Sequence, residues 1–178
     1  VVLWHTASVG LELWLTAIAQ GASQVWVLLT DDDAPPDREA LQQQMAVAQA
    51  IVSGLGYAGE HFRLLHARDA RDLAALDREL RAAPAQGVKT PATFAVQADK
   101  RSTLEMALEH LLAQAPQAGR AQAQAEVTDS IALPAVGSPL GSLAVDAATC
   151  TMCLSCVSAC PAAALADNPD KPQLKFIE

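Results

Sequence analysis

All four cysteines of the chain lie within one short run, and this run limits what the C-terminal part of the chain can fold around. They are Cys150, Cys153, Cys156 and Cys160, followed by Pro161, in the spacing C-x2-C-x2-C-x3-C-P. Thiolates are soft ligands that select metals such as zinc, copper(I) and the iron of iron–sulfur clusters. Three cysteines spaced two residues apart can wrap three corners of one metal cluster, whereas the fourth lies further along and is expected to point elsewhere. The run therefore predicts a metal centre bound by thiolates.

Three kinds of thiol site are compatible with four clustered cysteines, and the spacing favours one of them. The run has the spacing that ligates [4Fe–4S] clusters. Structural zinc prefers two separated C-x2-C pairs over a single clustered run. Disulfides are typical of small secreted chains, and nothing in the sequence marks secretion. We therefore interpret the run as an iron–sulfur site, with zinc or oxidised thiols as the alternatives, above all in a purified recombinant fragment.

Composition limits the partners and the location that we expect. Apolar residues make up 51% of the chain and aromatic residues only 4%, which favours helices packed closely on a sheet. The formal net charge of −8 argues against binding to nucleic acids or to anionic membranes. No apolar run reaches the roughly 18 residues of a membrane span. Because every cysteine belongs to one metal-type run, we expect a reducing, cytoplasmic location.

Strands and helices are predicted to alternate four times in the first two thirds of the chain. Apolar runs predict strands at 1–6, 24–30, 61–67 and, more weakly, 93–97. Amphipathic segments between and after these runs predict helices, the last of them opened by a capping box at 102–105. The alternation predicts an α/β fold with a four-stranded parallel sheet, helices on both faces and the strand order 2-1-3-4, as in flavodoxin-like or Rossmann-like folds. Trp4, Trp14 and Trp26 are expected in its core.

The chain is expected to divide into two domains and a linker. Residues 1–116 form the α/β domain, and 117–141 form a linker that is low in complexity and then rich in Pro and Gly. Residues 142–178 form a small domain, in which strands at 143–146 and 173–177 flank the cysteine run. This second domain is expected to be one half of a ferredoxin-like α+β iron–sulfur module.

Residues 142–178 resemble the first half of bacterial two-cluster ferredoxins, on the four cysteines, Pro161 and the flanking strands. The resemblance implies that Cys150, Cys153 and Cys156 bind a first [4Fe–4S] cluster and that Cys160 binds a second. No second cysteine run exists in the 178 residues. We therefore expect the chain to be cut inside a two-cluster module, and the clusters of the full-length protein to be absent or incomplete in this piece.

Residues 1–82 look more loosely like the delta-subunit-like domain of methyl-viologen-reducing hydrogenases. The similar features are 17–22 before an apolar strand, a long helix that ends at Leu55 and Gly56, and the segment 61–64. Cysteines after the first two strands bind a [2Fe–2S] cluster in that family. Here those places hold 6–8 and 30–32, which contain no cysteine, so we expect no cluster in this domain. The whole arrangement is similar to multi-cluster ferredoxin-like proteins of proteobacteria, which are often linked with formate dehydrogenase.

Four other features could be ligand or partner sites, but each also has a structural explanation. The loop 6–10 follows a strand end and could hold a small anion, but a plain loop is expected. Asp31, Asp32 and Asp33 could bind a hard cation, but a solvated helix start is expected. The histidines 5, 61, 66 and 110 are scattered singly and have no nucleophile nearby. The basic pair 100–101 could contact a partner subunit, although a solvated helix start explains it as well.

The sequence therefore favours electron transfer through [4Fe–4S] clusters within a larger multi-cluster protein. In this hypothesis the α/β domain is a docking or scaffold module, and the redox partner is for example of the formate dehydrogenase or hydrogenase type. No catalytic residues are predicted, so the chain would be an electron-transfer component of an oxidoreductase system. The alternative is a non-redox interaction or assembly protein with a structural or sensing cluster. A third hypothesis is an enzyme that uses the α/β domain on a small ligand.

Overall fold

The computed structural model of the chain describes eight stretches of residues. They are 4–68, 72–81, 84–116, 130–138, 141, 144–160, 163–171 and 173–176. The contacts divide the chain into two compact units, Val1–Leu140 and Gly141–Glu178. The predicted division into 1–116, 117–141 and 142–178 stays a prediction, because most of the expected linker lies outside the described residues.

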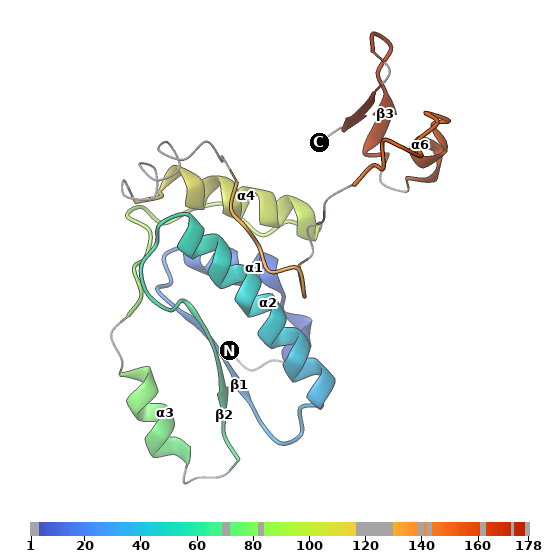
Figure 1. Ribbon diagram of the computed structural model, residues 1–178. Coiled ribbons are helices and arrows are strands. Elements are labelled where there is room, and N and C mark those ends of the chain that lie inside the picture. The colour runs from blue at the N-terminus through green and yellow to red at the C-terminus, as the bar shows by residue number, and fades with distance from the viewer. Residues whose placement is uncertain are drawn as a thin grey trace. The chain divides into compact units, whose positions relative to one another are not determined.

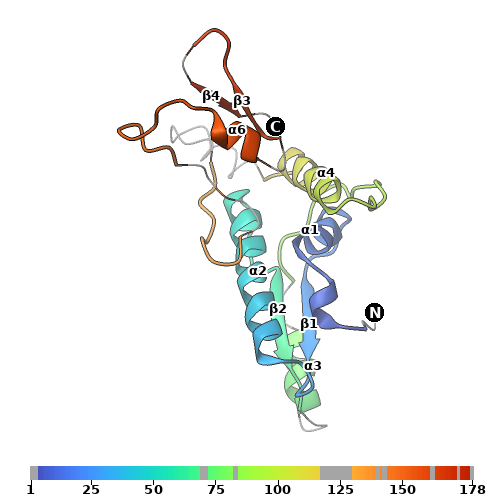
Figure 2. The same cartoon turned by 90° about the vertical axis from the view of Figure 1, so that its right-hand side faces the viewer.

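The first unit contains five helices and two strands among its described residues (Figure 1). In chain order they are the short 3-10 helix η1 (Thr6–Ser8), α1 (Leu11–Ala19), β1 (Val25–Leu29), α2 (Pro35–Gly54), β2 (Phe62–His66), α3 (Leu73–Leu80) and α4 (Lys100–Ala113). The strands β1 and β2 are parallel neighbours, with Val25 opposite Phe62 and Leu29 opposite His66. Figure 2 shows α2, the crossover between them, lying along this pair of strands.

The core lies between one face of this strand pair and the helices α1, α2 and α4. On each helix the core residues are spaced three or four apart, and on β1 they are spaced two apart, so they face the same side. They are Leu11, Trp14, Leu15 and Ile18 on α1, Leu41, Met45, Ala48 and Val52 on α2, Val27 and Leu29 on β1, Phe62 on β2, and Ala107 and Leu111 on α4. The helix α1 packs mainly against α4. Proline in the first turn of α2 is tolerated because those N–H groups have no partner within the helix. The helix α3 is different, since none of its described side chains is buried.

The prediction of a four-stranded parallel sheet is wrong. The described residues contain two small sheets, one of two parallel strands and one of two antiparallel strands. The strand order 2-1-3-4 is wrong as well, because the runs predicted as the second and third strands are direct neighbours in the first sheet.

The first of the two failed strand predictions is at the N-terminus. Residues 1–3 lie outside the described residues, and Trp4 is 102% exposed, so it is not a core residue. The next residues form η1, in which Ser8 N donates to His5 O at 3.1 Å. Ser8 Oγ also donates to His5 O at 2.6 Å. Hydroxyl side chains that bond locally compete with strand pairing, and here they hold a turn.

The second failed strand is the segment 93–97, which has no regular secondary structure and belongs to no ladder. Its polar backbone groups are taken by side chains instead: Gln20 Nε2 donates to Phe94 O at 2.9 Å, and Gln97 N donates to Thr103 Oγ1 at 3.0 Å. Val96 is 50% exposed, which a strand inside a covered sheet would not allow. The capping box at 102–105 is also corrected, because the N-cap of α4 is Asp99, whose side chain accepts from Ser102 N.

Residues 130–138 lie against α2 rather than apart from the first unit. Leu133 packs on the core, and Ile131 sits over Gly54, where a Cβ would come within 2.5 Å of Ile131 Cγ2. Gly137 has a φ of +77° and lies over Gln43, where a Cβ would come within 2.5 Å of Gln43 Cβ. Two glycines therefore permit the close approach of this segment to the helix.

The second unit contains α6 (Ser155–Ala159), β3 (Leu165–Asp167) and β4 (Leu174–Phe176). The returning strand predicted at 173–177 is present as β4, but it pairs antiparallel with β3, which was not predicted. The strand predicted at 143–146 is not formed by the described residues 144–146, and residues 142–143 lie outside the description. Asp146 begins a turn instead, since Ala148 N donates to Asp146 Oδ1 at 3.0 Å.

Among the helices that the structure describes, none combines the length and the apolar character that crossing a membrane requires.

Candidate metal centre

The four cysteines lie on one loop and the short helix that follows it. Cys150 and Cys153 precede α6, Cys156 lies within it, and Cys160 comes directly after its last residue. The loop begins at the Asp146 turn, where Cys150 N donates to Asp146 O at 2.9 Å. All four are free thiols; the first three are exposed and Cys160 is half-buried. Pro161 lies outside the described residues.

The backbone around Cys153 is held in an unusual conformation. Met152 and Leu154 have φ angles of 56° and 59°, in the left-handed region that costs a non-glycine residue about 1–2 kcal/mol. Left-handed residues alternating with other conformations turn backbone N–H groups into concavities that bind anions, including many Fe–S sites. The structure records no acceptor among the described residues for the N–H groups of Thr151, Met152, Leu154 and Cys156. These donors are therefore available to an anionic group held by the loop.

Cys153 has the thiol whose ionisation the loop favours most clearly. Its Sγ lies 3.3 Å from Ser155 Oγ. The Ser155 side chain, followed by the Ser155 N–H and the Thr151 side chain, stabilises the thiolate and lowers the pKa of Cys153 below its ordinary value of 9.0. A thiolate is the form that binds metal, so this environment suits a ligand.

The donor set fits an iron–sulfur cluster, although the loop is not closed around one. No group of three His, Cys, Asp or Glu side chains in the described part of the chain is arranged as metal ligands. None of the described side chains of the second unit is buried, and the four cysteines form no disulfide. Units shorter than about 40 residues usually need a metal or disulfides to fold. A cluster bound by the thiolates would supply the core that these residues lack.

The aspartates and histidines considered as possible sites bond to neighbouring residues instead. Asp33 accepts from Thr30 N at 2.7 Å and from Thr6 Oγ1, and these bonds, the Thr30 N–H first, lower the pKa of Asp33. His66 Nε2 lies 3.1 Å from Asp31 Oδ1, and His5 Nε2 lies 3.6 Å from Asp37 Oδ2. These carboxylates therefore pair with neighbours, and no cation site forms among the described residues.

The remaining candidates also have structural roles. His61 is fully buried, with Nε2 2.9 Å from Gln86 O, and His110 Nε2 lies 2.8 Å from Thr90 O. Lys100 lies 3.5 Å from Glu12, and Arg101 pairs with Glu105 on the same helix. The described residues show no nucleophile paired with a base.

The left-handed residues of the cysteine loop could not be found from the sequence. Met152 and Leu154 are not turn residues, and the usual signal for a positive φ is glycine or asparagine. Only the spacing of the cysteines indicated that the intervening backbone must bend tightly.

Residues 143–166 match the family of 4Fe-4S binding domains. The match covers all four cysteines, α6 and part of β3. No curated protein and no solved structure matches the chain. The match and the loop together make the second unit a ferredoxin-like iron–sulfur module with a [4Fe–4S] binding site. They support iron–sulfur electron transfer as the general function.

Proposed function

We propose that the chain transfers electrons through [4Fe–4S] clusters as part of a larger multi-cluster iron–sulfur protein, with the first unit as a docking or scaffold module. Cys150, Cys153 and Cys156 bind one cluster, and Cys160 contributes to a second. The observation that carries the proposal is the cysteine loop itself: exposed thiols, free N–H donors and the match to 4Fe-4S binding domains coincide on the same residues.

The residues of the loop would hold the cluster and tune it. When bound, a [4Fe–4S] cluster supplies a one-electron couple whose potential depends on hydrogen bonds to its sulfurs and on solvent exposure. The thiolates provide the bonds to iron, and the free N–H groups between Thr151 and Cys156 provide donors toward the sulfurs. Because the thiols of Cys150, Cys153 and Cys156 are exposed, an electron has a short path between the site and a docked protein.

The partner that we propose is a cytoplasmic redox protein, for example of the formate dehydrogenase or hydrogenase type. This choice of partner rests on the resemblances expected from the sequence alone, of 1–82 to the delta-subunit-like domain and of the whole chain to multi-cluster ferredoxin-like proteins of proteobacteria. The net charge of −8 also favours a protein partner over nucleic acid.

One measurement separates this proposal from the alternative. The larger multi-cluster protein is reconstituted with iron and sulfide under anaerobic conditions, then reduced and reoxidised while its EPR signal is recorded. Electron transfer predicts a reversible one-electron signal over repeated cycles. A cluster that is lost on the first reduction would contradict electron transfer and support the alternative.

The alternative, a structural or sensing cluster in an interaction or assembly protein, has one observation in its favour. The second unit has no buried side chain among its described residues, so a cluster there would hold the unit together whether or not it carried electrons. Circular dichroism of the reduced and reoxidised protein distinguishes the roles, because a purely structural cluster predicts unfolding of the second unit when the cluster is reduced.

A further inference from the structure

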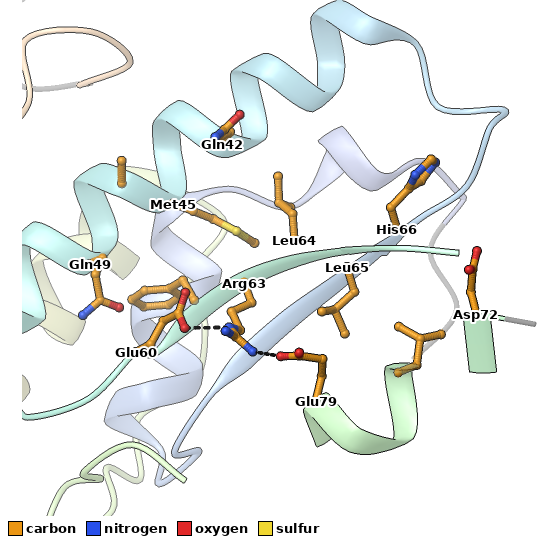
Figure 3. Close-up of a pocket in the computed structure, with 13 residues that line it drawn as sticks. Gln42, Met45, Gln49, Glu60, Arg63, Leu64, Leu65, His66, Asp72 and Glu79 are labelled. Atoms are coloured by element: carbon orange, nitrogen blue, oxygen red, sulfur yellow. Dashed lines mark hydrogen bonds and ion pairs between the residues drawn. The ribbon is translucent and has the colours of Figure 1, made fainter. Parts of the chain in front are cut away.

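A groove of about 740 Å³ lies between α2, β2 and α3 in the first unit. Figure 3 shows Gln42 and Met45 on the α2 side, Glu79 on the α3 side, and the strand β2 between them. Five consecutive residues of β2, Phe62–His66, line this one groove. Successive residues of a strand point to opposite faces of a sheet, so a groove that touches all five must run beside the edge of the strand.

The hydrogen bonding leaves this edge of β2 open as far as the described residues go. Val25 N donates to His61 O at 2.7 Å, and Ala67 N donates to Leu29 O at 3.0 Å. In this parallel register His61 O, both backbone groups of residues 63 and 65, and Ala67 N point toward β1. The N–H and C=O groups of Phe62, Leu64 and His66 therefore point away from β1, and no partner for them is recorded among the described residues.

The edge also lacks the usual protection against pairing. Proteins block edge strands with proline, with lysine, with bulges or by covering the edge. Phe62–His66 contains no proline and no lysine, and its register with β1 has no bulge. Its one basic residue, Arg63, is drawn aside into ion pairs with Glu60 and Glu79 (Figure 3).

The carboxylates of the groove lie on one side of it. The α2 side carries the apolar Met45 and Leu64 together with the uncharged amides of Gln42 and Gln49. On the α3 side Glu60 and Glu79 flank Arg63. Two carboxylates against one guanidinium leave this side of the groove acidic. A second copy of the chain would bring the same acidic rim and a charge of −8 to the interface, so the charge favours a basic occupant.

We propose that the open edge of β2 binds an extended, basic segment of a partner protein as a third strand. The five residues of β2 accommodate about 16 Å of such a strand at ~3.3 Å per residue. Side chains alternate along the partner strand: its apolar side chains face Met45 and Leu64, and its basic side chains face Glu60 and Glu79. Backbone bonds to Phe62, Leu64 and His66 hold it, as in other cases of strand addition. This inference rests on the docking role proposed for the first unit, and it identifies the edge of β2 as the docking site.

A short synthetic peptide that alternates lysine and valine tests the proposal. It is added to the whole protein, and amide hydrogen exchange is followed residue by residue by NMR. In the free protein we expect slow exchange at Arg63 and Leu65 and fast exchange at Phe62, Leu64 and His66. The peptide should slow exchange at these last three by at least tenfold, and should leave the first two nearly unchanged. Uniform slowing over all five, or none at millimolar peptide, would overturn the proposal.

Two control peptides separate strand addition from attraction between charges. Methylating the backbone nitrogens on one edge of the peptide removes the donors that a strand needs and keeps its charge, so binding should fall at least tenfold. Replacing lysine by glutamate should abolish binding. Equal binding of the methylated peptide, or of the acidic one, would contradict the proposed mode.

Protein variants provide a matched pair. Glu79→Gln removes a carboxylate from the groove and should weaken peptide binding about two- to fivefold, whereas Glu109→Gln on α4 should leave it unchanged. Sedimentation of the free protein serves as a further check, because dimerisation that the peptide cannot disrupt would identify a second copy as the occupant instead. Peptide binding and the EPR signal of the cluster are independent measurements. A negative binding result would therefore contradict the docking proposal without contradicting the redox proposal.

Discussion

Met152 and Leu154 have positive φ angles that neither residue prefers, so the cysteine loop imposes these angles on them. Backbone strain of this kind clusters at functional sites. The sequence gives no sign of these angles. It does indicate a thiolate site, because ligand type is a property of the cysteine side chains and their spacing.

The strain at Leu154 leads to a prediction with opposite outcomes for two substitutions. Leu154→Gly relieves a left-handed cost of about 1–2 kcal/mol and adds unfolded-state entropy of about 0.5–1 kcal/mol, so the loop should gain slightly in stability. Leu154→Val should lose stability, because a branched Cβ fits this conformation poorly. The measurement is the rate at which a chelator removes iron from the reconstituted protein. Faster loss from the glycine variant than from the valine variant would disprove this account of the loop.

Tyr57 tests the packing of the first unit. Its buried Oη donates to Leu111 O at 2.8 Å, and this bond ties the end of α2 to α4. Tyr57→Phe removes the donor and should lower the free energy of unfolding by about 1–3 kcal/mol. Urea titration followed by circular dichroism measures this, with Glu109→Gln as an exposed control expected within about 0.5 kcal/mol of the parent. Equal urea midpoints for Tyr57→Phe and the parent would show that this hydrogen bond does not stabilise the first unit.

At the scale of elements, helices and central strands could be predicted, but their pairing could not. The runs predicted at 24–30 and 61–67 became β1 and β2, and the predicted helices include α1, α2 and α4 with shifted ends. These elements are fixed by local periodicity and by turn residues. The expected strands at 1–6 and 93–97 failed because strand formation depends on partners distant in the sequence. In both segments Ser, Thr and Gln side chains bond to backbone groups that a strand ladder would use.

The N-cap of α4 predicts a pH dependence. Asp99 accepts from Ser102 N and from Ser102 Oγ, both at 2.8 Å, and the bond from the backbone N–H is the first cause that lowers the pKa of Asp99 below 3.8. A lowered folded-state pKa contributes stability that is present above the unfolded value and lost as the pH falls through the folded value. Asp99→Asn keeps a capping oxygen but does not titrate.

The variant should therefore lose less stability than the parent between pH 5 and pH 3. Thermal melting at both values measures the difference, and the parent at pH 7 provides the reference. The same loss in the parent and in Asp99→Asn would show that this carboxylate does not contribute.

The glycine that lets residues 130–138 lie on α2 provides a further test. At Gly137 a Cβ would meet Gln43 Cβ at 2.5 Å, and the φ of +77° disfavours any other residue. Gly137→Ala should detach this segment from α2 and leave the core intact, with a cost of about 1–2 kcal/mol to the attachment. Limited proteolysis should then cut near 130–138 several times faster. Gly87→Ala, where the added Cβ meets nothing within 4 Å, is the matched control and should be cut at the parent rate.

At the scale of the whole molecule, the two units have different sources of stability. The first has a core of apolar side chains between its helices and one face of a small sheet, and we propose the edge of that sheet as the place for a partner strand. The second has no buried side chain among its described residues, so we expect its stability to depend on what its cysteines bind. A docking unit joined to a metal-dependent unit would suit the proposed electron transfer.

The central claim, that the four cysteines hold iron–sulfur clusters, is tested most directly by analysing metal and sulfide bound, after reconstitution, to the larger multi-cluster protein of which we propose this chain is a part. Iron, zinc and acid-labile sulfide are measured for the parent and for a variant with Cys150, Cys153, Cys156 and Cys160 all changed to Ser. We predict iron and sulfide in equal amounts in the parent and less of both in the variant. Tightly bound zinc without sulfide in the parent, or equal iron in both proteins, would contradict the claim.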